Sequence, residues 1–380
     1  MNRKRILVLV LGLALAGHMA AQTRLPREVV KHPRPQDALS ARLGWALGEA
    51  ARAGSKDGFW VGYSIRRLME ENSYIGSVHT GWRDEVTLAE VLSGKTVVPG
   101  APRDESVGRT ARRVLDELEK SKKPEPKVWK DIAILLRYGP EKGPALDNVT
   151  MSDVTLAVDL KGLPLYWLGE AAEVESLTEL KAIYAKTTAD KVKEHLVAAV
   201  GIHGSPSLTV PLLRGVVEGG DADGVRKDAA FWLSQQDDAS VVGILVRTAK
   251  SDRSAEVRKS AVFGLSQVKR PEAVDEIIGL ARSAPDDRVR RDAIFWLGQM
   301  ATKKAGAALE EFALSDRDVK VQEHAVFALS ELPEGQGIEP LIKIAKTHPD
   351  PRVRKKAIFW LGETRDRRAL DTLIEIVKGK

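Results

Sequence analysis

Residues 289–297 read VRRDAIFWL, and the same pattern returns every 32 residues on either side. Three columns, each with one apolar residue per copy, define the register. They are Ala229, Ala261, Ala293, Ala325 and Ala357; Phe231, Phe263, Phe295, Phe327 and Phe359; and Leu233, Leu265, Leu297, Leu329 and Leu361. Five copies without an insertion indicate an array in which each unit stacks on its neighbours.

Each copy is expected to contain two helices, A and then B. In the B helix, Val289, Ala293 and Leu297 fall at i, i+4 and i+8, which is one helical face. Asp286 stands three residues before the valine, where it can cap the helix start. The A helix has its own column with the same step of 32, formed by Leu245, Ile277, Leu309, Leu341 and Leu373.

Weaker matches upstream extend the array to residue 172. We therefore predict about six helix pairs over 172–380. Residues 366–378 form a final A helix without a B partner, and its remaining face, with Asp371, Thr372 and Glu375, is polar. A helix of that kind is suited to cap the open end of an array.

The repeats resemble short HEAT repeats, most fully in the copy DPRVRKKAIFWLG at 350–362. They are similar to the compact type found in phycobilin-lyase-like proteins, and the resemblance covers a little over half of the chain. It implies a right-handed α-solenoid with the B helices on the concave side. Tetratricopeptide repeats have a similar length, but they separate Trp from Leu-Gly by two residues, whereas Trp296, Leu297 and Gly298 are contiguous.

The beginning of the chain has the layout of a secretory signal peptide over 1–21: cationic residues 2–5, an apolar run over 6–16, and small residues before Gln22. We expect a periplasmic or secreted protein whose mature chain has no membrane span; retention of this segment as an anchor is the alternative. Removing its three cations lowers the formal charge of the chain from +6 to +3. The charge then gives little reason to expect a nucleic-acid partner.

The region before the repeats has another organisation. Residues 22–36, which contain Pro26, Pro33 and Pro35, are predicted to be a tether. Residues 37–170 are predicted to form a small α+β domain with an antiparallel sheet. The helices are expected over 37–53 and 105–120, and the strands over 59–65, 128–138, 154–160 and 163–168, with the last two joined at Lys161-Gly162.

No constellation for catalysis is visible. The absence of cysteine excludes disulfides, thiolate metal sites and a cysteine nucleophile. The metalloprotease, α/β-hydrolase, Walker and dinucleotide-binding motifs are all missing. His195 and His203 are eight residues apart, and we assign them surface or capping roles rather than metal binding. We therefore predict no cofactor, no metal and no enzymatic activity.

The candidate binding residues lie on the outward side of the B helices: Lys227, Lys259, Arg291 and Lys355, with Phe263, Phe295 and Phe327. The cations are expected either to form a basic ladder facing an acidic protein or peptide, or to be a solvated face whose stems cover apolar surface. The Phe column is expected to wedge between adjacent B helices or to form part of an exposed stripe.

Two further columns are assigned to packing. Trp232, Trp296 and Trp360 alternate with Gly264 and Ala328, and this alternation of large and small residues favours core packing over a ligand-binding aromatic ladder. The resemblance to HEAT repeats implies that Arg226, Arg258, Arg290 and Arg354 bond to neighbouring repeats. Gln322 departs from that column, so the stack is expected to be looser there.

The sequence favours an exported scaffold that binds a protein or peptide on the concave face of the solenoid. One alternative makes the N-terminal α+β domain the active element, with Phe59, Trp60 and Trp82 as candidate aromatics and the solenoid as a spacer. Another is an enzyme like the bilin lyases that share the repeat. Only the repeat supports that second alternative.

Overall fold

The computed structural model describes residues 24–71, 73–76, 86–94, 126–140, 145–300 and 302–378. The predicted signal peptide, the predicted helix over 105–120 and Trp82 lie outside the described residues. The chain divides into two compact units between Leu208 and Thr209, and each unit is described by itself. Among the described residues, no helix has the length and apolar character needed to cross a membrane.

The first unit is built on a five-stranded mixed sheet with the strand order β1-β5-β2-β3-β4. The strands are β1 Val29–Lys31, β2 Phe59–Glu70, β3 Lys127–Gly139, β4 Ala145–Asp153 and β5 Leu165–Glu170. Strands β2, β3 and β4 pair in an antiparallel manner, as expected for this sheet, although β4 is not among the predicted strands; β5 lies parallel to both β1 and β2. The parallel pairings join segments far apart in the chain, and residue alternation carries no information about such crossovers.

Two predictions fail in this unit. Residues 29–31 of the predicted tether form β1, which pairs with β5. The predicted strand over 154–160 is irregular, because Asp153 accepts hydrogen bonds from the backbone N–H and the hydroxyl of Thr155 and so ends β4. The backbone carbonyls of Val154 and Leu156 do not bond to a neighbouring strand. They accept hydrogen bonds from the backbone amides at the start of α3, Leu88–Ser93.

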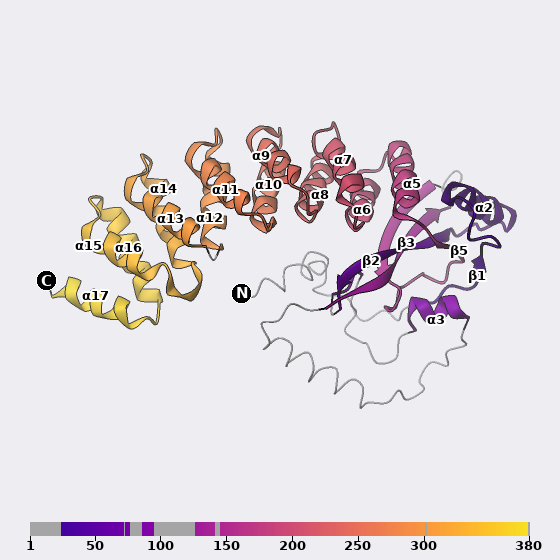
Figure 1. Ribbon diagram of the computed structural model, residues 1–380, viewed down its shortest axis with the longest axis horizontal. Coiled ribbons are helices and arrows are strands. Elements are labelled where there is room, and N and C mark those ends of the chain that lie inside the picture. The colour runs from indigo at the N-terminus through magenta and orange to yellow at the C-terminus, as the bar shows by residue number, and fades with distance from the viewer. Residues whose placement is uncertain are drawn as a thin grey trace, which may run out of the picture. The chain divides into compact units, whose positions relative to one another are not determined.

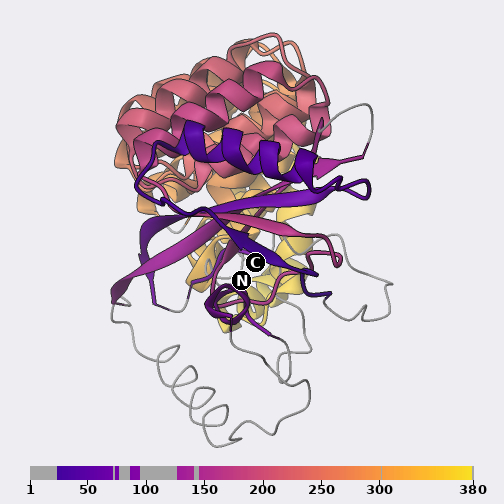
Figure 2. The same ribbon diagram turned by 90° about the vertical axis from the view of Figure 1, so that its right-hand side faces the viewer.

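Both faces of the sheet are covered, which explains why β2 begins with seven consecutive buried residues. Helix α2, Leu39–Arg52, lies on one side and α3 on the other (Figure 2). On the α3 side, Trp60 packs in a buried cluster with Leu88 and Leu135. On the opposite side, Phe59 stacks on Tyr138 with a centroid distance of 5.3 Å.

A buried polar chain ties the first helix pair to this sheet. The pair is α5, Glu173–Lys186, and α6, Asp190–Gly201. Tyr63 of β2 hydrogen bonds to Ser176 of α5 at 2.9 Å, and Ser176 bonds to His203 Nε2 at 2.8 Å. Because this pair is fixed to the sheet, the first unit extends to Leu208, whereas the sequence places the domain boundary at 170–172.

The second unit consists of helix pairs (Figure 1). The A helices are α7 Pro206–Val217, α9 Ser240–Ser251, α11 Pro271–Ser283, α13 Lys303–Ser315 and α15 Ile338–Thr347. The B helices are α8 Asp223–Ser234, α10 Ala255–Gln267, α12 Asp287–Gly298, α14 Val319–Ser330 and α16 Pro351–Glu363. Successive B helices contact each other more extensively than successive A helices do, which places the B helices on the inner side of this array.

The final helix α17, Arg367–Val377, is an unpaired A helix. The prediction that its free face is polar is wrong. Thr372 is buried, whereas Leu370, Ile374 and Val377 are 57%, 42% and 87% exposed. The positions that correspond to Leu370 and Val377 in α15 are buried because α16 packs against that helix. Helix α17 therefore keeps the apolar pattern of a covered helix without the B helix that covers it.

Two helical glycines give a matched test of how closely the B helices approach each other. A Cβ on Gly298 of α12 would lie 2.6 Å from the carbonyl oxygen of Ala328 in α14, whereas a Cβ on Gly279 of α11 would meet nothing within 4 Å. We expect Gly298→Ala to lower the free energy of unfolding by about 1–3 kcal/mol through overpacking. Gly279→Ala should raise it by about 0.5–1 kcal/mol through helix propensity. Urea unfolding measures both, and equal stabilisation by the two changes would contradict the close approach.

Candidate partner-binding face

The 32-residue register places an aromatic column on the same side of all five B helices of the second unit, the side that points away from the packed core. Within each B helix, the Phe lies four residues after the position that holds Lys227, Lys259, Arg291, Glu323 or Lys355. Side chains at i and i+4 are neighbours on a helix surface. The folding of each B helix therefore places one charged side chain beside one phenylalanine, and stacking of the repeats aligns these pairs.

The aromatic rings form one unbroken contact series, which we call the aromatic ladder. In order along the array, its rings are Trp232, Phe231, Phe263, Trp296, Phe295, Phe327, Trp360 and Phe359, and neighbouring centroids lie 4.9 to 6.5 Å apart. Phe231 stacks on Phe263 and Phe295 on Phe327, with interplanar angles of 6° and 19°. These separations are those of favourable aromatic pairs.

The ladder lies at the surface. Phe295 is 38% and Phe359 is 53% exposed, and the other six rings are half-buried. Assigning the Trp column to core packing is therefore wrong in part: Trp296 and Trp360 pack against the Phe of the preceding repeat, at 4.9 and 5.1 Å, but keep exposed area. Both arrangements expected for the Phe column are present: the rings stack between adjacent B helices, and they also form an exposed stripe.

The cations beside the ladder are unpaired. Lys227, Lys259 and Lys355 are exposed and Arg291 is half-buried. Within the part of the chain that the structure describes, none of their side chains forms a hydrogen bond or an ion pair. Lys227 and Lys355 therefore have charge available for another molecule, whereas the charge of Lys259 and Arg291 is partly offset by the nearby Asp292.

The A helices differ in this respect, because ion pairs between successive repeats neutralise their cations. Among the described residues, the six pairs are Arg247–Glu218, Arg282–Glu311, Lys304–Asp275, Lys343–Glu310, Lys346–Glu375 and Arg368–Glu339. Each pair joins one A helix, or the residue after it, to the next. These pairs neutralise most of the A-helix cations, whereas the exposed Lys250 and Lys303 form no ion pair among the described residues.

One carboxylate on the ladder side is unusual. Asp292 lies four residues before Trp296 and is half-buried. Burial raises the pKa of its carboxyl group, while the nearby Lys259 and Arg291 act to lower it. Asp292 therefore neutralises part of the positive charge at the centre of this face.

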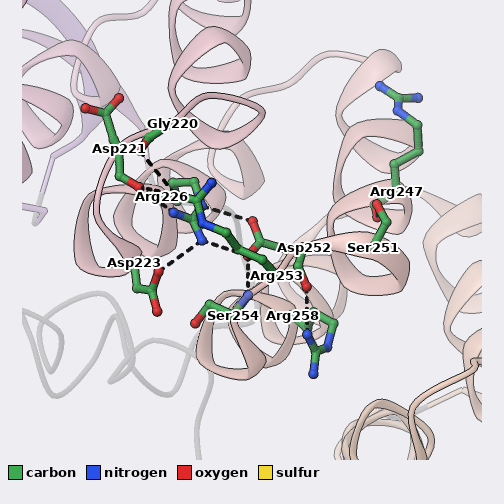
Figure 3. Close-up of polar contacts among 10 residues, drawn as sticks. All are labelled: Gly220, Asp221, Asp223, Arg226, Arg247, Ser251, Asp252, Arg253, Ser254 and Arg258. Atoms are coloured by element: carbon green, nitrogen blue, oxygen red, sulfur yellow. Dashed lines mark hydrogen bonds and ion pairs between the residues drawn. The ribbon is translucent and has the colours of Figure 1, made fainter.

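The arginine column forms the stacking links that the resemblance implied. Arg226 is 1% exposed and donates from Nε and Nη2 to the carboxylate of Asp252 in the next repeat, at 3.0 and 2.9 Å (Figure 3). Arg258 bonds to Asp286 at 3.1 and 2.5 Å, and Arg290 bonds to Asp316 at 2.8 Å. These side chains maintain the repeat spacing that aligns the ladder.

The link changes at Gln322. Gln322 keeps the bond from its amide to the carbonyl of Asp316 within its own repeat, at 2.7 Å. Position 348, which corresponds to Asp252 and Asp316, holds a buried histidine. Gln322 Oε1 and His348 Nε2 are both buried without a hydrogen-bond partner among the described residues. The prediction of a looser stack at this repeat is consistent with those two unsatisfied atoms. At the last copy, and within the described part of the chain, Arg354 bonds only to the carbonyls of His348 and Pro349 in its own repeat.

The other candidate residues do not form a chemical site. His203 is buried in the first unit, where its Nδ1 donates to the carbonyl of Ala199 at 2.8 Å. Phe59 and Trp60 are 4% and 2% exposed and belong to the core. Among the described residues, no group of three or more His, Asp or Glu side chains could hold a metal ion.

Comparison with known proteins identifies the repeats. A family model described as HEAT repeats matches residues 242–330 and 306–380, so this part of the chain is a HEAT-repeat array. No curated protein sequence matches the chain.

Several solved structures are similar to part of the chain. The complex of CpcE and CpcF of the phycocyanin lyase from Nostoc sp. PCC7120 is 19% identical, with 41% of this chain and 98% of that chain covered and a TM-score of 0.32. The YibA protein of Escherichia coli is 21% identical, with 52% and 78% covered and a TM-score of 0.31. Human deoxyhypusine hydroxylase is 17% identical, with 52% and 80% covered and a TM-score of 0.23. At these identities the similarity concerns the fold alone.

Proposed function

We propose that this chain is an exported, non-catalytic scaffold that binds a protein or peptide partner along the inner, B-helix face of its HEAT-repeat array. The observation that carries the proposal is the aromatic ladder flanked by unpaired cations. Exposed aromatic rings contribute most of the binding energy in many interfaces. Charges beside them guide a complementary partner and set its orientation.

The inner face of an array suits this role. A solenoid presents a long, continuous surface formed by many similar units, and such surfaces recognise extended partners. HEAT solenoids typically bind proteins, and residues 242–380 are such an array. The export half of the proposal rests on the sequence of residues 1–21 alone.

Of the candidate aromatics in the first unit, the two that the structure describes, Phe59 and Trp60, offer no comparable surface. Phe59 and Trp60 are in the core, where Trp60 Nε1 donates to the carbonyl of Leu160 at 3.0 Å. Their burial favours a structural role. For that reason we place partner binding on the B helices.

Two sets of substitutions on the B-helix face test the proposal. A partner is first captured from envelope extract with the mature protein and then produced in pure form, so that its affinity can be measured by calorimetry. We expect Phe295→Ala with Phe359→Ala, and separately Lys227→Glu with Lys259→Glu and Lys355→Glu, each to weaken binding by at least about tenfold, or 1.4 kcal/mol.

The control is a charge reversal on the A helices. Lys250 of α9 and Lys303 of α13 are exposed. Lys250→Glu with Lys303→Glu should leave both affinity and helicity unchanged. Full affinity in both B-helix variants, with circular dichroism showing an intact fold, would refute the assignment of the face.

A further inference from the structure

The aromatic ladder has a period of two helix pairs. Helices α8, α12 and α16 each present a Phe followed by a Trp, whereas α10 and α14 present a Phe followed by a buried small residue, Gly264 or Ala328. In each of the three double positions, the Phe and Trp centroids lie 5.0 to 5.4 Å apart with interplanar angles of 75° to 80°. The face therefore repeats the same two-ring anchor on every second B helix.

The most exposed Phe rings of the ladder mark the same period. Phe295 and Phe359 lie two repeats apart, in α12 and α16, and Phe327 of α14 between them is half-buried. A cation lies four residues before each exposed ring, namely Arg291 and Lys355. Lys356 also lies over the Trp360 ring, with its Nζ 5.9 Å from the centroid. Each exposed anchor thus combines an apolar surface with positive charge.

The distance between anchors sets the size of a matching ligand. Packed helices lie about 8–10 Å apart, so two repeats separate the anchors by about 16–20 Å. An extended or polyproline-type chain advances about 3.1–3.4 Å per residue. Two anchors are therefore spanned by about five or six residues of an extended peptide.

From this period, and on the basis of the proposed function, we infer that the partner presents an extended peptide segment in which an apolar side chain with an adjacent carboxylate recurs every five to six residues. The apolar side chains stack on the two-ring anchors, and the carboxylates pair with Arg291 and Lys355. Aromatic-lined grooves of this kind suit extended chains, which lose little conformational entropy on binding.

Charge complementarity favours this occupant over a second copy of the chain. Glu323 of α14 occupies the position that corresponds to Arg291 and Lys355, and it lies between the two most exposed anchors. It is half-buried and lies near Arg352. Carboxylates of the ligand are thus attracted at the anchors and repelled between them. The charge pattern reinforces the spacing set by the rings.

The test uses synthetic peptides of identical composition, each with two Glu-Phe pairs in a Gly/Ser background, and the full-length mature protein. The anchors are separated by about three, six or nine residues, and calorimetry gives the affinities. We expect the six-residue spacing to bind at least about tenfold more tightly than the others, because simultaneous engagement of two sites requires a matching span. Phe295→Ala with Phe359→Ala should remove that advantage, whereas Lys250→Glu should not.

The outcomes separate this inference from the proposed function. Equal affinity at all three spacings, lost in the double Phe variant, would overturn the period and leave binding on the B-helix face standing. If no peptide binds measurably but partner capture still depends on Phe295 and Phe359, the inference of an extended acidic segment would be overturned and the proposed function would stand. Peptide binding that is unchanged in the double Phe variant would refute both.

Discussion

Replacing Arg226 by methionine is expected to lower the free energy of unfolding at this repeat by about 3–5 kcal/mol, the cost of leaving one partner of a buried ion pair without the other. The side chains of Arg226 and Asp252 are 1% and 7% exposed. Arg226 also bonds to Asp223 and to the carbonyl of Asp221. Its removal therefore leaves Asp252 charged and buried, with the backbone N–H of Ser254 still donating to Oδ1, whereas the carbonyl of Asp221 keeps its bond from Arg253.

The same column contains the control for this experiment. Arg258 also links to the next repeat, but it bonds to Asp286 because Ala284 stands at the position of Asp252. The side chains of Arg258 and Asp286 are 19% and 28% exposed, so water can replace part of what is lost. Arg258→Met should cost less than half as much as Arg226→Met. The double variant Arg226→Met with Asp252→Asn should recover part of the loss, since no charge is then left buried.

Hydrogen exchange measures the result repeat by repeat. Because contacts in a solenoid are mainly between neighbours, amides of α8, α9 and α10 should lose protection first, while those of α15 and α16 keep theirs. Equal losses of stability from Arg226→Met and Arg258→Met would contradict the argument from burial.

Lowering the pH from about 6.5 to about 4 is expected to destabilise the first unit by about 3 kcal/mol through His203. Burial lowers the pKa of this imidazole to about 4, and the repulsion from Arg67 acts in the same direction, while Glu173 and the carbonyls of Ala199 and Val200 oppose it. In the unfolded chain the ring takes up a proton near pH 6.5, whereas in the folded chain it does not. The unfolded state thus binds more protons in this range, so stability is complete above it and is lost as the pH falls.

The geometry explains why the folded ring stays neutral. His203 Nδ1 donates to a carbonyl, so in the neutral ring Nε2 has a lone pair and accepts the hydroxyl proton of Ser176. Tyr63 then donates to Ser176. A second proton on the ring would reverse two hydrogen bonds inside the core, which is costly because His203 and Ser176 are buried.

Urea unfolding of the full chain across this pH range checks the prediction. His203→Gln should flatten the pH dependence, and His324→Gln, at an exposed position of α14, should leave it unchanged. The ring of His203 should also show no protonation by nuclear magnetic resonance above about pH 5. Burial lowers the pKa of His195 as well, which adds to the effect in the same direction. A pH dependence that persists in full in His203→Gln would assign it to other groups.

Several features follow from the sequence because they depend on local, periodic signals. The 32-residue register predicts the helix pairs, since each copy makes similar contacts with the next, and the resemblance to HEAT repeats implies the arginine links. The continuous apolar run that begins β2 and the runs that form β3 and most of β5 indicate buried strands. The candidate residues Phe263, Phe295 and Phe327 are members of the ladder for the same reason.

Other features depend on contacts between segments far apart in the chain. The apolar alternation over 154–160 indicates a strand, yet its carbonyls bond to the amides of α3 instead of a neighbouring strand. The short strand β1 has too few residues to show any alternation. The bond of Ser176 to both Tyr63 and His203, which unites the first helix pair with the sheet, has no signature in the sequence.

The sequence by itself determined that the C-terminal part of the chain is a HEAT-like array with charged and aromatic columns on one side of its B helices, because helical periodicity assigns each residue of a helix to a face. Tertiary structure alone decided which members of those columns stay exposed. Stacking buries an arginine against an aspartate of the next repeat, yet leaves Phe295 and Phe359 at the surface and the neighbouring cations unpaired. The exposed fraction of each side chain depends on how close the adjacent helix lies. The residues of a single repeat do not determine that distance.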